Sequence, residues 1–352
     1  MRVAATRCCG QNAARMIPKA SVPRQQAPQW QHALREAYGK PEELLAALHL
    51  PADLPALQAG RLGNFPLRVP RSYAARMQPG DPDDPLFLQV WPAHAEDASV
   101  AGYTLDAVGD LHKLRGGGLI HKYQGRVLVI ATGACAVHCR YCFRRHFPYS
   151  EQLAARGHWR ETLDTIAQDP TLHEVILSGG DPLSLSDDKL AEFAEGLESI
   201  PHVRRLRLHT RQPIVLPERI DERLLAWLDR SRLQKVIVLH ANHANELDST
   251  VSAALQPLRD RGITLLNQAV LLRRVNDSVA ALQALSERLL ECGILPYYLH
   301  LLDRVTGAAH FEVEALRATE LMRELAARLP GYLIPRLVRE EAGAMSKTWI
   351  AW

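Results

Sequence analysis

The sequence predicts an α/β fold in which parallel strands alternate with helices to form a barrel or a partial barrel. After residue 120, short segments rich in β-branched residues alternate with longer amphipathic segments. This spacing requires parallel strands with right-handed crossovers and excludes a β-sandwich. Polar motifs follow several of the predicted strands, at the end of a barrel where ligands bind. We therefore expect one site assembled from many loops.

The residues before this repeat predict an N-terminal region of a different character. Residues 1–34 have basic but no acidic side chains, which superficially matches an organellar transit peptide. Their content of Pro, Gln and Ala favours a disordered N-terminus, or a chain that starts at Met16. Apolar residues at helical spacing predict helices over residues 35–57, and six prolines predict an irregular connection over residues 66–100. We expect residues 35–119 to form a helical and irregular preface.

Seven segments after residue 120 have the length and composition of strands. They are residues 127–131, 174–177, 204–209, 236–240, 263–270, 296–302 and 332–338. Between them lie amphipathic segments that predict helices over residues 151–168, 187–199, 218–229, 245–261, 277–292 and 311–329. In the second helix, Leu190, Phe193 and Leu197 share one face. The barrel is expected over residues 120–330, with a C-terminal strand and tail over residues 331–352.

Composition and charge exclude several classes of protein. The chain has 42 Lys and Arg against 39 Asp and Glu, and its net charge of +3 is too balanced for a dedicated nucleic-acid or anionic-membrane binder. No segment approaches the run of about 18 apolar residues that a membrane span needs. Three of the six cysteines fall within eight residues, and no secretory signal is present. These features predict a cytoplasmic protein with reduced thiols.

Three cysteines follow the first predicted strand at a spacing typical of a metal centre. Cys135, Cys139 and Cys142 stand on one loop, and three thiolates at this spacing suit an iron–sulfur cubane whose fourth iron stays open for a chelating ligand. A structural zinc site needs a fourth ligand, for which His138 or His146 is available. Zinc and unliganded core cysteines therefore remain as alternatives.

A glycine pair follows the second predicted strand in the motif SGGDPL. Glycines at a strand end let the backbone approach a ligand closely, and Asp181 can accept a hydrogen bond from an ammonium group. On its own the motif is also a common strand-end turn. Further polar motifs end the third, fourth and fifth strands: HTRQP, HANHAN and NQ.

Taken in order, these motifs resemble the lysine 2,3-aminomutase family of the radical S-adenosylmethionine superfamily. The similarity covers roughly residues 35–350. The N-terminal motif LRVPRSYAARMQPGDPDDPL and the short C-terminus bring it closest to the bacterial branch that serves elongation factor P. The segments that carry the resemblance are HKYQGRVLVI, CRYCFRRHFPY, SGGDPL, LHTRQPIVLPERI, HANHANE, LLNQAVLLRRVND, PYYLHLLDRVTGAAHF and GYLIPRLVREEAGAMSK.

The resemblance implies a partial (β/α)6 barrel and three cofactors: a 4Fe–4S cluster, S-adenosylmethionine and pyridoxal 5′-phosphate. Cys135, Cys139 and Cys142 would ligate the cluster, whose open iron binds the amino and carboxylate groups of S-adenosylmethionine. An electron from the reduced cluster would then cleave S-adenosylmethionine and give a 5′-deoxyadenosyl radical. The further cofactor-binding residues implied are Ser178, Gly179, Gly180, Asp181, Asn267 and Gln268.

Pyridoxal phosphate requires a lysine, which by resemblance is Lys347. Tyr123 and Arg126, just before the first strand, would contact the ring and the phosphate of the cofactor. Without the family context, Lys347 is an ordinary lysine of a C-terminal tail and the other two are strand-edge residues. The glycine-rich run that precedes the cofactor lysine in the family is reduced here to AGAMSK.

Three charged residues are expected to bind a lysine substrate. By resemblance, Arg144 would hold the carboxylate as a bidentate clamp, while Asp303 and Glu340 would pair with the ε-ammonium group. Arg144 has a second interpretation as part of a solvated basic patch with Arg140 and Arg145. Glu340 stands where dedicated aminomutases have Asp, so the pocket differs by one methylene.

The resemblance implies an isomerase that converts L-α-lysine to (R)-β-lysine for the modification of elongation factor P. Its expected partners are L-lysine, elongation factor P with its lysyl-transferring ligase, and an electron donor such as flavodoxin or ferredoxin, without direct nucleic-acid or membrane binding. Two alternatives stay open. One is an aminomutase that produces a free β-amino acid from another substrate, and the other is a non-catalytic, zinc-stapled protein of the translation apparatus.

Overall fold

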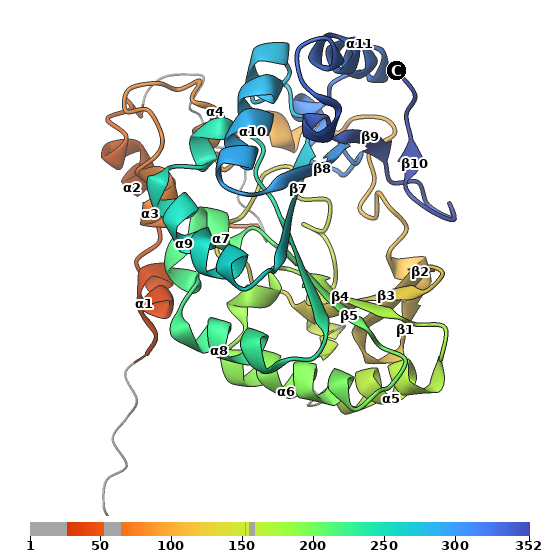
Figure 1. The fold of residues 1–352 in the computed structure, drawn as a ribbon. Helices are drawn as coiled ribbons and strands as arrows, with labels where there is room; N and C mark the ends of the chain where they lie inside the picture. The colour runs from red at the N-terminus through yellow and green to blue at the C-terminus, as the bar shows by residue number, and fades with distance from the viewer. Residues whose placement is uncertain (1–26, 53–64, 152, 155–158) are drawn as a thin grey trace, which may run out of the picture.

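The computed structural model of the protein describes residues 27–52, 65–151, 153–154 and 159–352. Within these residues, ten strands form one mixed sheet in which the strands follow one another in chain order (Figure 1). The strands are β1 (Leu114–Arg115), β2 (Leu119–Tyr123), β3 (Arg126–Thr132), β4 (Glu174–Gly179), β5 (Arg205–Thr210), β6 (Gln234–Leu239), β7 (Thr264–Val270), β8 (Leu295–His300), β9 (Arg336–Arg339) and β10 (Thr348–Trp349).

Strands β3 to β9 are parallel, and antiparallel strands flank them at both edges of the sheet. β1 and β2 extend the edge next to β3, and β10 extends the edge next to β9. Among the described strands no pairing joins the two edges. The barrel is therefore partial, as predicted.

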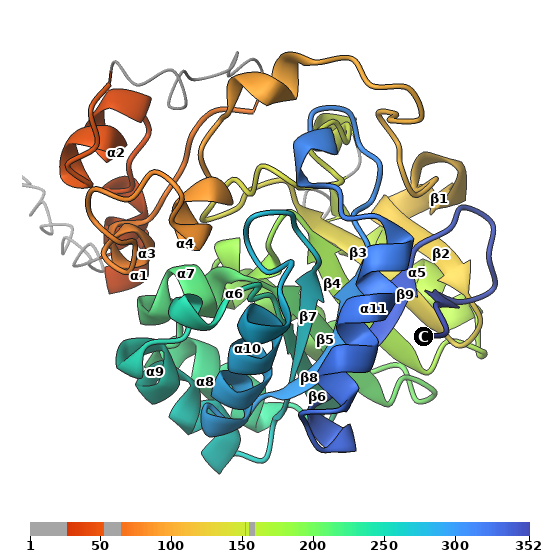
Figure 2. The ribbon, with the colours of Figure 1, turned by 90° about the horizontal axis from the view of Figure 1, so that it is seen from above.

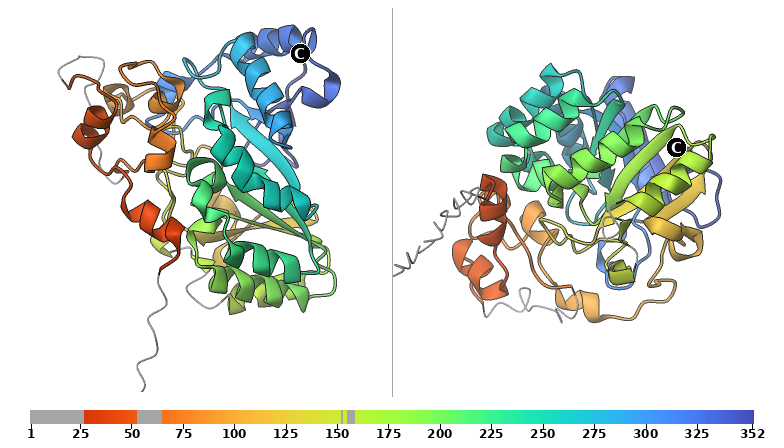
Figure 3. Two further views of the ribbon diagram at one scale, coloured as in Figure 1. Left: turned by 60° about the vertical axis from the view of Figure 1, so that its left-hand side comes forward. Right: turned by 90° about the horizontal axis from the view of Figure 1, so that it is seen from below.

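A helix of at least nine residues follows each strand from β3 to β8, which gives the predicted six strand–helix units. These helices lie on the outer face of the curved sheet (Figure 2 and Figure 3). No described helix is long and apolar enough to cross a membrane. The helices are α1 (Gln29–Arg35), α2 (Pro41–Ala47), α3 (Arg71–Ala74), α4 (Pro85–Leu88), α5 (Arg160–Gln168), α6 (Asp187–Glu198), α7 (Gln212–Val215), α8 (Glu222–Arg230), α9 (Ser249–Asp260), α10 (Val279–Glu291) and α11 (Ala315–Ala326).

The alternation of side chains along each strand separates the main core from the inside of the barrel. On β4, Val175 and Leu177 belong to the same buried cluster as Phe193 on the apolar face of α6. The intervening Ile176 and Ser178 point to the opposite side and line an internal cavity. Burial of the outer face thus fixes which side chains reach the cavity.

A second apolar core joins the N-terminal helices to the cysteine-bearing loop after β3. Trp30, Tyr73 and Phe87 are buried in this core together with Ala136 and Val137, which stand among the cysteines of that loop. The expected helical preface therefore supports the site directly, because it packs against the loop that carries the thiols.

Several predicted boundaries differ from the structure. The strand predicted over residues 332–338 is β9, which begins only at Arg336 because residues 331–333 form a helical turn. Helix α1 begins at Gln29, inside the range 1–34 that we expected to be disordered, because Trp30 is 2% exposed and lies beneath the guanidinium of Arg219. Residues 1–26 lie outside the described residues. Of the helix predicted over residues 151–168, only α5 forms a regular α-helix in the described part.

The turn after β4 lies directly against the loop after β3. The backbone N–H of Gly180 donates to the carbonyl of Thr132 (2.6 Å), and that of Asp181 donates to the carbonyl of Ala134 (2.8 Å). A Cβ on Gly180 would lie 2.5 Å from the oxygen of Ala134, and one on Gly179, whose φ is +115°, would lie 2.7 Å from that of Thr132. The glycines therefore admit the backbone of the neighbouring loop, and both also line the cavity in which the sequence predicts a ligand.

Replacing Gly180 with Ala should therefore destabilise the fold. Because the new methyl group meets backbone atoms that cannot move independently, we expect the free energy of unfolding to fall by about 1–3 kcal/mol. Urea denaturation of the cofactor-free protein measures this change. Gly331→Ala is the matched control, since a Cβ there meets nothing within 4 Å. Equal stability of the two variants would contradict the proposed contact.

Candidate active site

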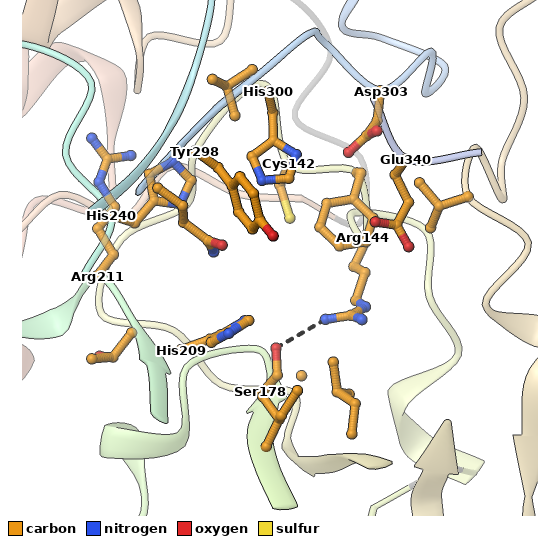
Figure 4. Close-up of a pocket in the computed structure, with 18 of the residues that line it drawn as sticks. Cys142, Arg144, Ser178, His209, Arg211, His240, Tyr298, His300, Asp303 and Glu340 are labelled. Atoms are coloured by element: carbon orange, nitrogen blue, oxygen red, sulfur yellow. Dashed lines mark hydrogen bonds between the residues drawn. The ribbon is translucent and has the colours of Figure 1, made fainter. Parts of the chain in front are cut away.

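A cavity of about 460 Å³ opens at the carboxyl ends of the parallel strands (Figure 4). Side chains from the ends of β4, β5, β7 and β8 and from the loop after β3 line it, as expected for a barrel enzyme. The cavity brings together every predicted site residue except Asn267. Those that line it are Tyr123, Arg126, Cys135, Cys139, Cys142, Arg144, Ser178, Gly179, Gly180, Asp181, Gln268, Asp303, Glu340 and Lys347.

The three thiols of the predicted metal centre face this cavity as free cysteines. Burial raises the pKa of Cys135, and the nearby Asp181 and the other two cysteines raise it further. Burial and Cys139 likewise raise the pKa of Cys142 to about 11. Three adjacent thiolates therefore require added positive charge, which the iron of a cluster supplies. The donor set fits a cluster held by three cysteines.

The zinc alternative finds no support in the positions of the two candidate histidines. His138 Nδ1 lies 2.8 Å from the carbonyl oxygen of Pro66, and His146 Nε2 lies 3.1 Å from that of Thr306. Among the described residues, no three His, Cys, Asp or Glu side chains converge as the ligands of a single metal ion would. Each histidine thus has one ring nitrogen turned to a backbone carbonyl, and neither belongs to a described group of three ligands for a single metal ion.

Arg144 is held in the cavity by two side chains that fix the direction of its guanidinium group. Its Nε donates to Asp110 (2.7 Å), and its Nη1 donates to the hydroxyl of Ser178 (3.1 Å). Burial alone would raise the pKa of Asp110, but Arg144 and Lys122 hold it below its usual value. No partner of Arg144 Nη2 is found in the described part of the chain. Arg144 is thus a buried guanidinium fixed in the cavity wall and not part of a solvated patch.

Glu340 and Lys347 form a second ion pair in the wall of the cavity, and Glu340 lies on the same side as Arg144 in Figure 4. Lys347 Nζ lies 2.5 Å from Glu340 Oε2, and the hydroxyl of Tyr123 donates to Glu340 Oε1 (2.6 Å). Burial alone would raise the pKa of Glu340, but Lys347, Tyr123 and Lys122 lower it to about 2. The glutamate expected to bind a substrate ammonium therefore already binds an ammonium of the protein.

Asp303 is the second predicted carboxylate and lies within electrostatic reach of the same lysine. Burial raises its pKa to about 7, Lys347 opposes this shift, and Glu340 adds to it. Near neutral pH the group is therefore poised between its two protonation states, and a cation that enters the cavity favours the ionised state.

Arg126 and three histidines complete the lining. The guanidinium of Arg126 lies 4.8 Å from the ring centre of Tyr123, its cross-strand neighbour on β2. Burial lowers the pKa values of His209, His240 and His300, that of His240 to about 3, so the imidazoles are neutral at pH 7. In Figure 4 these histidines surround the same space as Arg144 and Glu340. The sequence predicts none of these histidines individually, although His209 and His240 belong to the strand-end motifs.

Two predicted site residues have internal partners instead of a free face. Asp181 accepts four hydrogen bonds, from the backbone N–H groups of Leu183, Arg211 and Gln212 and from the hydroxyl of Thr210. It therefore has little remaining capacity for the ammonium group that we expected it to bind. Asn267 lies outside the cavity lining, where its amide exchanges two hydrogen bonds with the backbone of Ala241.

Several other residues at the site could not be predicted individually from the sequence. Asp110 and Lys122 join Arg144 to Glu340 through a continuous chain of ion pairs. Arg211 and Glu246 form a buried pair beside Cys139. Their motifs, HTRQP and HANHANE, marked the region, but the pairing itself depends on residues far apart in the sequence.

Comparison with known proteins identifies the family. No protein-family model matches the chain. The L-lysine 2,3-aminomutase of Escherichia coli K12 is 48% identical over 91% of this chain and 93% of its own length. That of Haemophilus influenzae is 44% identical over 96% and 99%. The enzyme of Clostridium subterminale is 32% identical over 91% of this chain and 77% of its own length.

The solved structures that match are less similar. A radical SAM methyltransferase from Sphaerobacter thermophilus is 18% identical, with a TM-score of 0.44 over 63% of this chain and 68% of that chain. The structure of anSMEcpe with bound AdoMet and a peptide is 12% identical, with a TM-score of 0.42 over 56% and 57%. Identity over nearly the whole length of the E. coli and H. influenzae relatives is the decisive finding. The chain belongs to the lysine 2,3-aminomutase family and is an isomerase.

Proposed function

We propose that the protein converts L-α-lysine to (R)-β-lysine with a 4Fe–4S cluster, S-adenosylmethionine and pyridoxal 5′-phosphate. The observation that carries this proposal is the meeting of three kinds of group in one cavity: three free thiols, a lysine amine, and a fixed arginine together with two carboxylates. A non-catalytic zinc protein would not need the last two. When bound, the cluster and S-adenosylmethionine supply radical chemistry, and pyridoxal phosphate supplies a π-system for the migrating nitrogen.

Cys135, Cys139 and Cys142 would hold the cluster on the loop after β3. That loop is buttressed from one side by the N-terminal core and from the other by the turn after β4. Three protein ligands leave one iron of a cubane open, which is the position that an amino-acid chelate such as S-adenosylmethionine requires. The rigid support fixes where the radical is generated.

Lys347 would bind pyridoxal phosphate through its amine, with Arg126 as the phosphate ligand and Tyr123 beside it. Arg126 lines the cavity, and its guanidinium contacts the ring of Tyr123. Lys347 Nζ lies 5.8 Å from the ring centre of Tyr298, which supplies an aromatic wall for a planar cofactor. Covalent use of the amine removes the cation that now pairs with Glu340.

The substrate would lie between Arg144 and the two carboxylates. Arg144 is anchored through Nε and Nη1, so Nη2 faces the cavity as a donor to the lysine carboxylate. Asp303 and Glu340 would receive the ε-ammonium group, since a buried cation needs charged partners. The longer glutamate side chain is compatible with pairing first to Lys347 and then to substrate.

Activity should depend on Lys347 and on the cysteines in a defined way. After anaerobic reconstitution and reduction, the protein with S-adenosylmethionine, pyridoxal phosphate and L-lysine should yield β-lysine, measured by mass spectrometry. We expect Lys347→Ala and Cys139→Ala each to lower turnover at least about 1,000-fold, because each removes a cofactor attachment.

The exposed Lys113→Ala and the buried Cys292→Ala serve as controls that leave the cavity intact. Unchanged activity of Lys347→Ala would refute its role. Deoxyadenosine without β-lysine would favour the alternative of another amino-acid substrate.

The apparent affinity for lysine should rise with pH through about 7. Asp303 has a raised pKa of about 7 because of its burial, so it becomes an anion only as the pH passes this value. KM for lysine should therefore fall between pH 6 and 8, and Asp303→Asn should raise KM by about tenfold and abolish the change. Steady-state rates at several pH values test this, with the exposed Asp164→Asn as control. The same pH dependence in Asp303→Asn would contradict the assignment.

We further propose that the β-lysine serves to modify a lysine of elongation factor P. What supports this destination is the N-terminal motif LRVPRSYAARMQPGDPDDPL, which carries the resemblance to the bacterial branch that serves this factor. A low-potential one-electron protein such as flavodoxin or ferredoxin would supply the electron.

A coupled reaction tests the destination of the product. The reconstituted protein, L-lysine, elongation factor P and its lysyl-transferring ligase should add one β-lysyl group to the factor, seen as a mass increase of one lysyl residue and distinguished from α-lysyl by peptide fragmentation. Lys347→Ala should abolish the β-lysyl product. Equal labelling with α-lysine and with β-lysine would argue against this destination.

A further inference from the structure

A buried arginine contacts one of the three cysteines of the proposed cluster. Arg211 stands at the end of β5, and its side chain is 6% exposed. Its Nη1 donates to Cys139 Sγ (2.7 Å) and to the hydroxyl of Tyr141 (2.5 Å). Its Nη2 donates to Gln89 (2.7 Å) and to Glu246 (2.8 Å). The guanidinium is therefore directed at a thiol from a buried position in the cavity wall.

The partners of Arg211 hold it in place and are themselves held. Glu246 has no exposed side-chain surface, and its second oxygen accepts from the backbone N–H groups of Asn242 (2.8 Å) and His243 (3.1 Å). Gln89 is also fully buried and donates to Glu246 (3.1 Å). The direction of the arginine toward Cys139 is thus set by a network that leaves it little freedom.

We propose that Arg211 acts through Cys139 as a positioning residue that raises the reduction potential of the 4Fe–4S cluster, with Glu246 limiting the effect. This inference rests on the proposed function, because it requires the cluster. Reduction adds one electron to the cluster and makes it more negative by one charge. A guanidinium hydrogen-bonded to a ligand sulfur stabilises the reduced state, whereas the carboxylate behind it favours the oxidised state.

The two charges make the proposal distinguishable from a purely structural role. Removing the arginine together with its counter-charge should shift the cluster toward the oxidised state, since the hydrogen bond to sulfur is lost at constant net charge. Neutralising Glu246 alone should shift it toward the reduced state, since the arginine then acts without its counter-charge. A general loosening of the site gives no reason for opposite signs.

The test is an anaerobic redox titration of the reconstituted protein with dithionite and mediator dyes, followed by the EPR signal of the reduced cluster. For Arg211→Gln/Glu246→Gln we expect the ratio of reduced to oxidised cluster at a fixed potential to fall about tenfold, equal to about 59 mV for one electron. For Glu246→Gln we expect the ratio to rise. Iron and sulfide content and the EPR line shape confirm that each sample holds the same cluster.

A second buried pair provides the matched control. Arg219 and Asp187 are also buried, with the same separation of 2.8 Å between the charged groups, and no cysteine among the described residues contacts this arginine. Arg219→Gln/Asp187→Asn should keep the wild-type potential. An unchanged potential in Arg211→Gln/Glu246→Gln, or shifts of one sign in both Glu246 variants, would overturn the proposal. Failure of the wild-type chain to assemble any cluster would instead refute the proposed function.

Discussion

The site depends on the close backbone contact between the cysteine loop after β3 and the glycine turn after β4. Two hydrogen bonds across this contact fix the loop, and no side chain fits between the two backbones. Asp181 extends the connection, because its carboxylate accepts from the residues that end β5. Three successive strand ends are thereby joined before any ligand binds, and the direction of Arg211 toward Cys139 follows from the same arrangement.

The charged side chains of the cavity form ion pairs that share partners, and a charged substrate can join them. A continuous chain of ion pairs runs from Arg144 through Asp110, Lys122 and Glu340 to Lys347. Both ends of this chain carry a group that the proposed reaction needs, a carboxylate-binding arginine and a cofactor-binding amine. Use of the amine by the cofactor would free Glu340 for a substrate ammonium, so cofactor binding and substrate binding share one carboxylate.

The sequence predicted those features that depend on local pattern. The barrel strands were located because their buried faces produce apolar runs. The cysteines were predicted from one contiguous motif, and the lysine was predicted from the family resemblance; all four line the cavity. Partnerships between distant segments were not predictable: Asp110 reaches Arg144 only in the folded chain. The motif NQ predicted both Asn267 and Gln268 as site residues. Neighbours on a strand face opposite sides, so only Gln268 reaches the cavity. The sequence predicts a ligand for Asp181, because nothing in the sequence indicates that its carboxylate accepts hydrogen bonds from other parts of the chain.

An anaerobic crystal structure of the reconstituted protein with S-adenosylmethionine, pyridoxal phosphate and L-lysine tests the central claim most directly, namely that one cavity holds all the reacting groups. We predict cluster density on Cys135, Cys139 and Cys142, continuous density from Lys347 or from substrate to the cofactor, and the substrate carboxylate on Arg144. A cluster bound elsewhere, or lysine bound with its carboxylate away from Arg144, would contradict the account.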